Sequence, residues 1–458
     1  MTIKEEIFRE YDIRGIVDED LTPETVELLG KGIGTYFRQK NAQSVALGGD
    51  CRLSSPVFAE ILSRGIRSTG CSVTYLGTIP TPLLYFTMFT KPMEAGVMIT
   101  GSHNPPEYNG FKMMVGKETL FGETIKDIYR IIASGEFVQE EEGTESDYDI
   151  LPEYHDYIVS NITLSRKLKV VVDAGNGTGG VVAVPLFREL GCEVIPLYCE
   201  MDGNFPNHHP DPTLPEALED LIEKVAETGA DLGIAYDGDS DRIGVIDDIG
   251  NIIWGDMLMI LLARDILPRN PGAAVISEVK ASKLLYDEIE RLGGRPIMWK
   301  TGHSLIKKKI VEEKALLAGE MSGHIFFADK YFGFDDAIYS SARVLEILST
   351  TNKKLSELLS DLPTMHNTPE IRVYASDEVK FKIVDGVKNI LSQRLPVIDI
   401  DGVRAIYPTG WGLVRASNTQ DALVLRFEAQ TEEDLKAIKE DVEQTIEDVI
   451  KKLDADRT

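Results

Sequence analysis

Short apolar runs rich in Val, Ile and Leu alternate with helix-like stretches over most of the chain. Such runs are typical of buried strands, and their alternation with helices predicts mixed α/β layers in which helices cover a sheet. The pattern repeats as three units of three strands. The predicted strands span residues 44–50, 70–77 and 95–101 in the first unit, 169–175, 191–197 and 230–237 in the second, and 274–279, 293–299 and 315–320 in the third.

The middle strand of each unit follows a glycine-containing turn, as expected where a helix ends and a strand begins. From about residue 368 the pattern changes to predicted strands at 370–374, 402–407 and 422–429 and helices at 378–391 and 431–453. We therefore expect an α/β protein with three similar mixed α/β domains and a smaller α+β C-terminal domain. The predicted boundaries are 1–147, 148–251, 252–365 and 366–458, with Pro363 and residues 367–369 in the last linker.

Composition narrows the class of protein. The chain has 458 residues, a hydrophobic fraction of 43% and a formal net charge of −27, which argue against disorder, a fibrous repeat and nonspecific nucleic-acid binding. Its longest strongly apolar stretch, residues 257–263, is far shorter than the ~20 residues of a membrane-spanning helix. The charged start predicts no secretory signal, and four cysteines without a Cys-x-x-Cys pair predict free thiols in the cytoplasm. The sequence points to no membrane and to no obligate protein partner.

The third strand of each unit ends in a polar loop, at residues 102–105, 237–242 and 320–324. Sites in open α/β sheets form beyond the carboxyl ends of the strands, so three domains facing one another can deliver these loops to one cleft.

The first loop combines Ser102, His103 and, slightly later, Lys112. The simpler interpretation is a glycine- and proline-rich turn. Alternatively, the serine is a nucleophile or phosphoryl carrier, with the two basic side chains beside the phosphoryl oxygens. The Gly-x-Ser-x-Gly elbow of hydrolases is absent, which disfavours triad chemistry.

The second loop places carboxylates at alternate positions, Asp237, Asp239 and Asp241, followed by Arg242. On a tight loop they can converge on one hard cation, and Mg²⁺ fits best if a phosphate supplies further oxygens. A solvated acidic turn is the alternative. A calcium loop is disfavoured, because the glycine stands at the second position rather than the sixth.

The third loop carries Glu320 and Ser322, which project the same way if extended and can bracket neighbouring sugar hydroxyls. A polar strand-to-loop turn explains this segment equally well. Near the C-terminus, residues 410–419 lie between two predicted strands, either as a phosphate clamp or as a long hairpin loop. Basic side chains gather in the candidate loops of an acidic chain: Arg14, Lys112, Arg242, Lys280, His303, His324 and Arg415.

The segments at 11–15, 100–106, 237–242, 319–324 and 415–419, in this order, resemble those of the α-D-phosphohexomutases, and most closely the phosphomannomutase/phosphoglucomutase group. Segments 202–212 and 299–308 extend the resemblance over the whole chain. It implies four domains around a central active-site cleft. Two positions depart from the family pattern: Ser240 stands where many members have glycine, and Gly49 where arginine is common.

The resemblance also implies roles for individual residues. Ser102 would be the phosphorylated serine and, with Asp237, Asp239 and Asp241, a ligand of one Mg²⁺. Catalysis at the transferred phosphoryl would involve Ser102, His103, Lys112, Arg242 and His303. The phosphosugar would be bound by Tyr11, Arg14, Lys280, Gly302, His303, Glu320, Ser322, His324, Arg415, Ser417, Asn418 and Thr419.

The implied reaction is an isomerisation between hexose 1-phosphate and hexose 6-phosphate, with mannose, glucose or both as the sugar. It would pass through an enzyme phosphoserine and a hexose 1,6-bisphosphate, with His303 or Lys112 as candidate general base. The alternatives are a phosphoglucosamine mutase, a sugar phosphatase, and a catalytically silent phosphosugar-binding protein.

Overall fold

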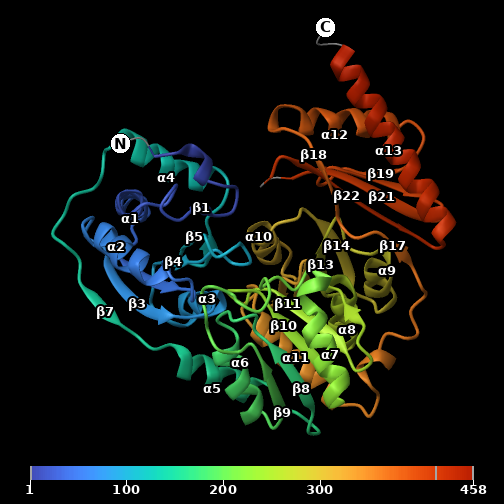
Figure 1. Cartoon of the computed structure of the whole chain (residues 1–458), viewed down its shortest axis with the longest axis horizontal. Coiled ribbons are helices and arrows are strands. Elements are labelled where there is room, and N and C mark those ends of the chain that lie inside the picture. Colours follow the sequence, from blue (N-terminus) through green and yellow to red (C-terminus); the bar gives the residue numbers. More distant parts are fainter. Residues whose placement is uncertain (1–2, 418–419, 456–458) are drawn as a thin grey trace.

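Four β-sheets follow one another along the chain in the computed structural model, which describes residues 3–417 and 420–455. Figure 1 shows them in an arc, from the N-terminal sheet through the second and third to the C-terminal one. The first domain has strands β1 (Ile13–Ile16), β2 (Ser44–Gly49), β3 (Ser72–Thr78), β4 (Ala95–Ile99), β5 (Tyr108–Val115), β6 (Glu118–Thr119) and β7 (Glu145–Asp147) and helices α1 (Pro23–Gln39), α2 (Ser55–Arg67), α3 (Thr81–Thr90) and α4 (Glu123–Ser134).

The next two domains use the same kinds of element. The second has α5 (Leu151–Asn161), β8 (Lys169–Asp173), α6 (Gly180–Glu189), β9 (Glu193–Leu197), α7 (Glu219–Thr228), β10 (Leu232–Tyr236), β11 (Ile243–Asp247) and β12 (Ile252–Ile253). The third has α8 (Gly255–Ile266), β13 (Ala274–Glu278), α9 (Lys283–Arg291), β14 (Arg295–Trp299), α10 (His303–Glu313), β15 (Leu317–Gly319), β16 (Ile325–Phe327) and α11 (Ala337–Ser349).

One strand plan recurs in these three sheets. The orders are β5-β4-β2-β3, β11-β10-β8-β9 and β16-β15-β13-β14. In each, the three predicted strands are parallel and the first of the order is an antiparallel hairpin partner. The prediction of three similar α/β domains is therefore confirmed, and the three polar loops are the equivalent hairpin turns after β4, β10 and β15.

Local sequence fixes several element ends. Thr22 caps α1 by accepting a hydrogen bond from the backbone N–H of Thr25, and Pro23 follows at the first helical position, where no N–H is needed. Helices α4 and α7 end at Gly135 and Gly229, both in the left-handed conformation that glycine adopts without penalty.

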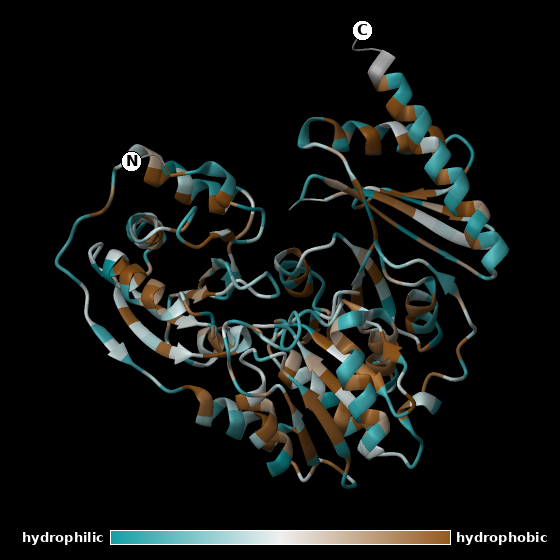
Figure 2. Cartoon of the chain, viewed as in Figure 1, coloured by the Kyte–Doolittle hydropathy of each residue, from teal (hydrophilic) through white to brown (hydrophobic). Residues whose placement is uncertain are grey.

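The main hydrophobic core runs through the first three domains as one cluster, from α3 and α5 through β8 and β10 to α8 and α11. Figure 2 shows the apolar colouring concentrated on these inner strands and helices. A second cluster fills the other face of the first sheet, between α1, α2 and α4. No helix of the described residues is long and apolar enough to cross a membrane.

The C-terminal domain has its own core between one sheet and two helices. Its elements are β17 (His366–Asn367), β18 (Ile371–Tyr374), α12 (Asp377–Leu391), β19 (Val397–Ile398), β20 (Val403–Tyr407), β21 (Gly410–Ala416), β22 (Ala422–Ala429) and α13 (Glu432–Ala455). The expectation that residues 410–419 form a loop was wrong for 410–416, which are the inner strand β21, paired with β20 and β22. The glycines in Gly-Trp-Gly hid this strand, because glycine is depleted in strands.

Candidate active site

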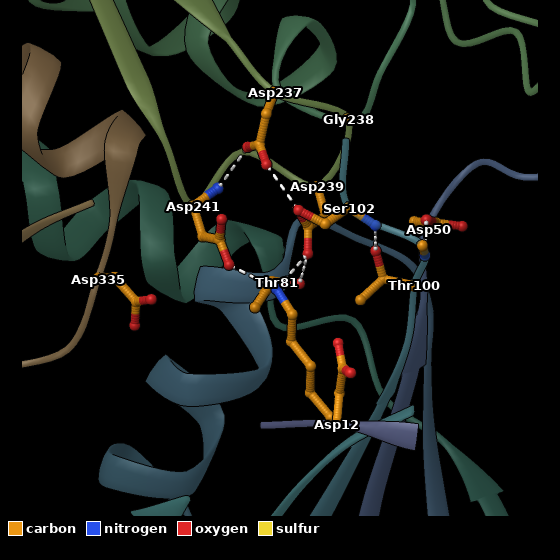
Figure 3. A network of polar contacts seen from close by, with 12 residues as sticks. Asp12, Asp50, Thr81, Thr100, Ser102, Asp237, Gly238, Asp239, Asp241 and Asp335 are labelled. Carbon is orange, nitrogen blue, oxygen red and sulfur yellow. Dashed lines mark hydrogen bonds and ion pairs between the residues drawn. The ribbon is translucent and has the colours of Figure 1, made fainter. Parts of the chain in front are cut away.

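Ser102 stands in the turn after β4 with its side chain directed at the second domain. Its backbone is in the left-handed region, with φ of 49°, and the side chain is buried. Its Oγ donates a hydrogen bond to Oδ2 of Asp237 over 2.8 Å (Figure 3). The same oxygen lies 3.1 Å from Nδ1 of His103. The structure thus joins the first two polar loops directly.

The aspartates of the second loop form a buried group of carboxylates. Asp237 accepts from the backbone N–H groups of Asp241 and Arg242, while Lys112 donates to Asp239 over 2.7 Å and to Asp241 over 2.5 Å. Each of the three aspartates offers an oxygen within 4.8 Å of the others. The Oδ1 atoms of Asp239 and Asp241 are buried with no hydrogen-bond partner among the described residues. This set of hard oxygen donors fits a divalent cation.

The pKa values of two of these carboxyls are shifted in opposite directions. Burial and the neighbouring Asp241 and Asp239 charges raise the pKa of Asp237 well above its usual range. Burial alone would also raise the pKa of Asp239, but Lys112 and a hydrogen bond from Thr81 outweigh it and lower that pKa. A bound cation would favour the ionised form of all three carboxyls.

A second junction joins the loops of the second and third domains. Nε of Arg242 donates to Nε2 of His324 over 3.0 Å, and Nδ1 of His324 lies 3.2 Å from Oδ2 of Asp335. His303 stacks on His324 with ring centroids 5.4 Å apart, and its Nδ1 lies 3.3 Å from the same carboxylate. Burial, together with the nearby Lys307 ammonium, lowers the pKa of His303. His303 is therefore neutral at neutral pH.

Glu320 is buried and accepts a hydrogen bond from the backbone N–H of Gly302 over 2.7 Å. The Tyr11 hydroxyl, from the first domain, donates to the carbonyl of Thr301 over 3.0 Å. A Cβ on Gly302, whose φ is 132°, would lie 2.5 Å from that hydroxyl oxygen, so any other residue there would have to displace the Tyr11 ring. Ser322 is half-buried in the same turn as Glu320.

The C-terminal domain meets the third domain through a backbone hydrogen bond and an ion pair. Arg415, at the end of β21, donates from Nε to Oδ2 of Asp401 over 3.0 Å, and the backbone N–H of Thr301 reaches the same oxygen over 3.1 Å. Lys280 donates to Glu370 over 3.1 Å, and despite burial this ammonium lowers the pKa of Glu370 to about 2.

The remaining predicted substrate residues lie at the edge of this network. Arg14 donates to Asn104 over 2.9 Å and is paired with Asp12. Ser417 is buried and its backbone N–H donates to the carbonyl of Ala422. Asn418 and Thr419 lie outside the described residues, so their predicted contacts stay predictions.

Direct contacts therefore connect loops from all four domains, and the sequence missed several of the connecting residues. Thr81, Asp335, Glu370 and Asp401 hold predicted site residues, yet none lies in a motif with a recognisable pattern. At Ser240 the backbone has a φ of 61°, a conformation that glycine adopts without steric penalty. This accounts for the glycine that many family members have at this position. A Cβ on Gly49 would lie 3.4 Å from the Cβ of Ser55, an ordinary van der Waals contact.

Comparison with known protein families gives four consecutive matches. The family description "Phosphoglucomutase/phosphomannomutase, alpha/beta/alpha domain I" matches residues 5–139, domain II of the same family residues 152–250, domain III residues 254–366, and its C-terminal domain residues 370–445.

Individual relatives agree. The chain is 50% identical over 439 residues to the phosphomannomutase/phosphoglucomutase of Pseudomonas aeruginosa, covering 96% of this chain and 95% of the relative. It is 46% identical over 450 residues to the phosphoglucomutase of Neisseria gonorrhoeae, covering 97% and 98%. A crystal structure of a phosphoglucomutase/phosphomannomutase family protein from Burkholderia thailandensis superposes with a TM-score of 0.93 at 41% identity, covering 98% of each chain.

Proposed function

The chain belongs to the phosphoglucomutase/phosphomannomutase family, and we propose that it is the isomerase that interconverts hexose 1-phosphates and hexose 6-phosphates of glucose, mannose or both. The observation that carries this proposal is the contact between Ser102 and the carboxylate group. A buried hydroxyl lies 2.8 Å from Asp237, among oxygens suited to a divalent cation and beside the Lys112 ammonium. This arrangement suits a serine that carries a phosphoryl group.

The reaction consists of two phosphoryl transfers. Phosphoserine 102 gives its phosphoryl to the 6-hydroxyl of a hexose 1-phosphate: the P–Oγ bond breaks, the P–O6 bond forms, and the hydroxyl proton leaves to a base. The resulting 1,6-bisphosphate then reorients within the site, so that its two phosphates exchange places. Ser102 then takes the phosphoryl from O1, O1 regains a proton, and hexose 6-phosphate is released.

The carboxylates of Asp237, Asp239 and Asp241, together with Oγ of Ser102, would hold Mg²⁺. When bound, this ion supplies positive charge to the oxygens of the transferred phosphoryl. Lys112 contributes a fixed ammonium: burial works against its charge, but Asp239 and Asp241 raise its pKa well above the usual range. Arg242 adds a second cation, and its hydrogen bond to His324 aims it across the domain boundary.

A strongly held ammonium is a poor proton acceptor, so we assign the base to His303 rather than to Lys112. His324, which stacks on His303, already accepts a hydrogen bond from Arg242 at Nε2. Glu320 and Ser322 would hold the sugar hydroxyls. Arg14, Lys280 and Arg415 would hold the phosphate that is not reacting, with Ser417 beside Arg415, in exchange for the carboxylates they contact now. Because the bisphosphate binds both ways round, the same cations serve either phosphate.

We also place the protein in the cytoplasm, since its four cysteines are all free thiols.

The experiment is a coupled assay with glucose 1-phosphate, mannose 1-phosphate and glucosamine 1-phosphate, each with Mg²⁺ and trace glucose 1,6-bisphosphate. The proposal predicts hexose 6-phosphate from glucose 1-phosphate, mannose 1-phosphate or both, without release of free phosphate. Free phosphate formed as fast as substrate disappears would indicate a phosphatase. Tight binding of the phosphosugar with no phosphate on Ser102 would indicate a catalytically silent binding protein. A marked preference for glucosamine 1-phosphate would indicate a phosphoglucosamine mutase.

A further inference from the structure

Arg52 is buried beneath the loop that carries Ser102. Its Nη1 donates to the carbonyls of Pro105 and Tyr108 over 2.6 and 2.9 Å, and its Nη2 to those of Ser102 and Asn104 over 2.9 and 2.6 Å. Its Nε donates to Oδ2 of Asp50 over 3.2 Å. All five N–H groups of one guanidinium are therefore used, four of them on consecutive turns of a single loop.

These hydrogen bonds stabilise a backbone conformation that is unfavourable by itself. Ser102 has a positive φ, which is unfavourable for a residue with a side chain, and its carbonyl oxygen accepts from Arg52. Asp50 supports the same turn from the other side, because its Oδ2 also accepts from the backbone N–H of Gly101 over 3.2 Å. The guanidinium reaches no catalytic side chain, so any effect on the reaction passes through the loop.

The second domain also packs against this guanidinium. The Phe205 ring lies over it, with 5.1 Å from the guanidinium carbon to the ring centroid, and Phe205 itself has a φ of 48°, rare for a bulky residue. Gly203 packs so closely that a Cβ there would lie 2.5 Å from the carbonyl oxygen of Cys51. Both residues belong to segment 202–212, to which the sequence analysis assigned no role.

We propose that Arg52 is the positioning residue of the transfer serine: its fork of hydrogen bonds fixes residues 102–108 so that the Ser102 hydroxyl faces Asp237, and Phe205 couples this placement to the domain that carries the aspartates. The proposal rests on the proposed function for its effect on turnover. Its structural part, the fixed loop, is independent of that function.

Two substitutions separate geometry from charge. Lysine in Arg52→Lys keeps the positive charge but has only three donors on a flexible stem, too few for five acceptors. We expect kcat to fall about 100-fold with KM within about 3-fold, since a displacement of about 1 Å in a reacting group costs that much. Amide hydrogen exchange of residues 101–110 should rise. Arg343→Lys is the matched control, because Arg343 is equally buried and its guanidinium contacts Asp329 and Asp265 instead of this loop. It should lower the melting temperature and leave kcat unchanged.

The outcomes divide cleanly. If Arg52→Lys keeps wild-type kcat, or loses it without faster exchange in the loop, the positioning role is wrong. If Arg52→Lys fails to fold, Phe205→Leu provides the test, because it removes the aromatic ring and leaves the hydrogen bonds of Arg52 in place. We expect about a 10-fold loss of kcat and faster amide hydrogen exchange in residues 101–110. Wild-type values for both would overturn the proposal. Turnover of the unmodified enzyme tests the proposed function separately, because hydrogen exchange reports on the loop whether or not the protein is a mutase.

Discussion

Oγ of Ser102 and Oδ2 of Asp237 lie 2.8 Å apart, although 135 residues separate them in the chain. The two residues end equivalent strands of two domains built on one plan, so the contact depends on how the domains pack rather than on either loop alone. It places the proposed phosphoryl carrier at the carboxylates proposed to hold the metal.

Ser102→Ala removes that carrier. We expect turnover to fall at least about a thousand-fold while the melting temperature stays near that of wild type, because only one hydroxyl is lost. The measurements are the coupled assay and labelling of the protein by a ³²P-labelled hexose bisphosphate. Ser134→Ala, at the exposed end of α4, is the control and should keep both activity and label. Wild-type labelling of Ser102→Ala would contradict the assignment.

Asp239→Asn keeps the size of the side chain and removes one negative charge of the carboxylate group. The apparent affinity for Mg²⁺ should weaken at least about 10-fold, with a matching shift in the Mg²⁺ concentration needed for activity. Isothermal titration calorimetry of the protein with MgCl₂ measures the first quantity without turnover. Asp248→Asn, a carboxylate of the second domain that accepts from the backbone N–H of Ser356, is the control. Equal affinities in wild type and Asp239→Asn would rule this ligand out.

Arg415→Ala should act mainly on binding. A charge-assisted hydrogen bond to phosphate is worth about 1.5–3 kcal/mol, so KM for the phosphosugar should rise roughly 10- to 100-fold, with a smaller change in kcat. Steady-state kinetics over a wide substrate range measure both. Arg394→Ala removes an arginine of the same domain that is paired with Asp441 and should leave KM alone. An unchanged KM in Arg415→Ala would contradict the phosphate clamp.

The ion pair between Lys280 and Glu370 predicts how stability depends on pH. The pKa of Glu370 is about 2 in the folded protein and ~4.3 in an unfolded chain, so the unfolded chain takes up the proton first as pH falls. The stabilisation is complete above about pH 4.5 and is lost as pH falls toward 2, with at most about 3 kcal/mol at stake. Urea unfolding at several pH values should show a shallower acid loss in Glu370→Gln, whereas Glu378→Gln, on the exposed face of α12, should retain the wild-type slope. Identical slopes in all three proteins would refute the prediction.

Gly302→Ala tests the close contact with Tyr11. The new Cβ would lie 2.5 Å from the Tyr11 hydroxyl oxygen and would also disturb the backbone N–H that holds Glu320. Gly293→Ala is a matched control, since Gly293 also has a positive φ of 76° but nothing within 4 Å of its Cβ position. We expect Gly293→Ala to cost about 1 kcal/mol of unfolding free energy and Gly302→Ala about 1–3 kcal/mol more, with reduced turnover. Equal costs for the two variants would show that the contact relaxes freely.

The sequence predicted those parts of the molecule whose signal is local. All nine repeat strands were recognisable because they are short, buried and apolar, and Ser102 and the three aspartates because each stands just past such a strand. The hairpin partners β5 and β11 were missed, and so was β21, since polar residues or glycines interrupt their patterns. The hairpin partner β16 was missed because it has only three residues.

The residues that connect the loops of the site could not be predicted from the sequence either. Each of three such residues has a partner far away in the chain: Arg52 lies 50 positions from Ser102, Asp335 lies 32 positions from His303, and Asp401 lies 100 positions from Thr301. Nothing in their local segments distinguishes them from ordinary surface charges. Only the packing of the domains shows that they are buried or partly buried among the site residues.

The separate core of the C-terminal domain bears on how such proteins can be recombined. The apolar cluster shared by the first three domains extends to Leu355 and nearby leucines, whereas the cluster of the last domain begins with Ala375. A chimera joined between these points would exchange the proposed phosphate clamp of one relative for that of another without exposing either hydrophobic core. The contacts that would have to match are the apolar packing of Trp411 and Leu413 against Val279 and the hydrogen bonds of Arg404 to the carbonyls of Val279 and Ala281. The polar contacts between Lys280 and Glu370, between Thr301 and Asp401, and from Arg426 to Asp256 and the Lys280 carbonyl would also have to be kept.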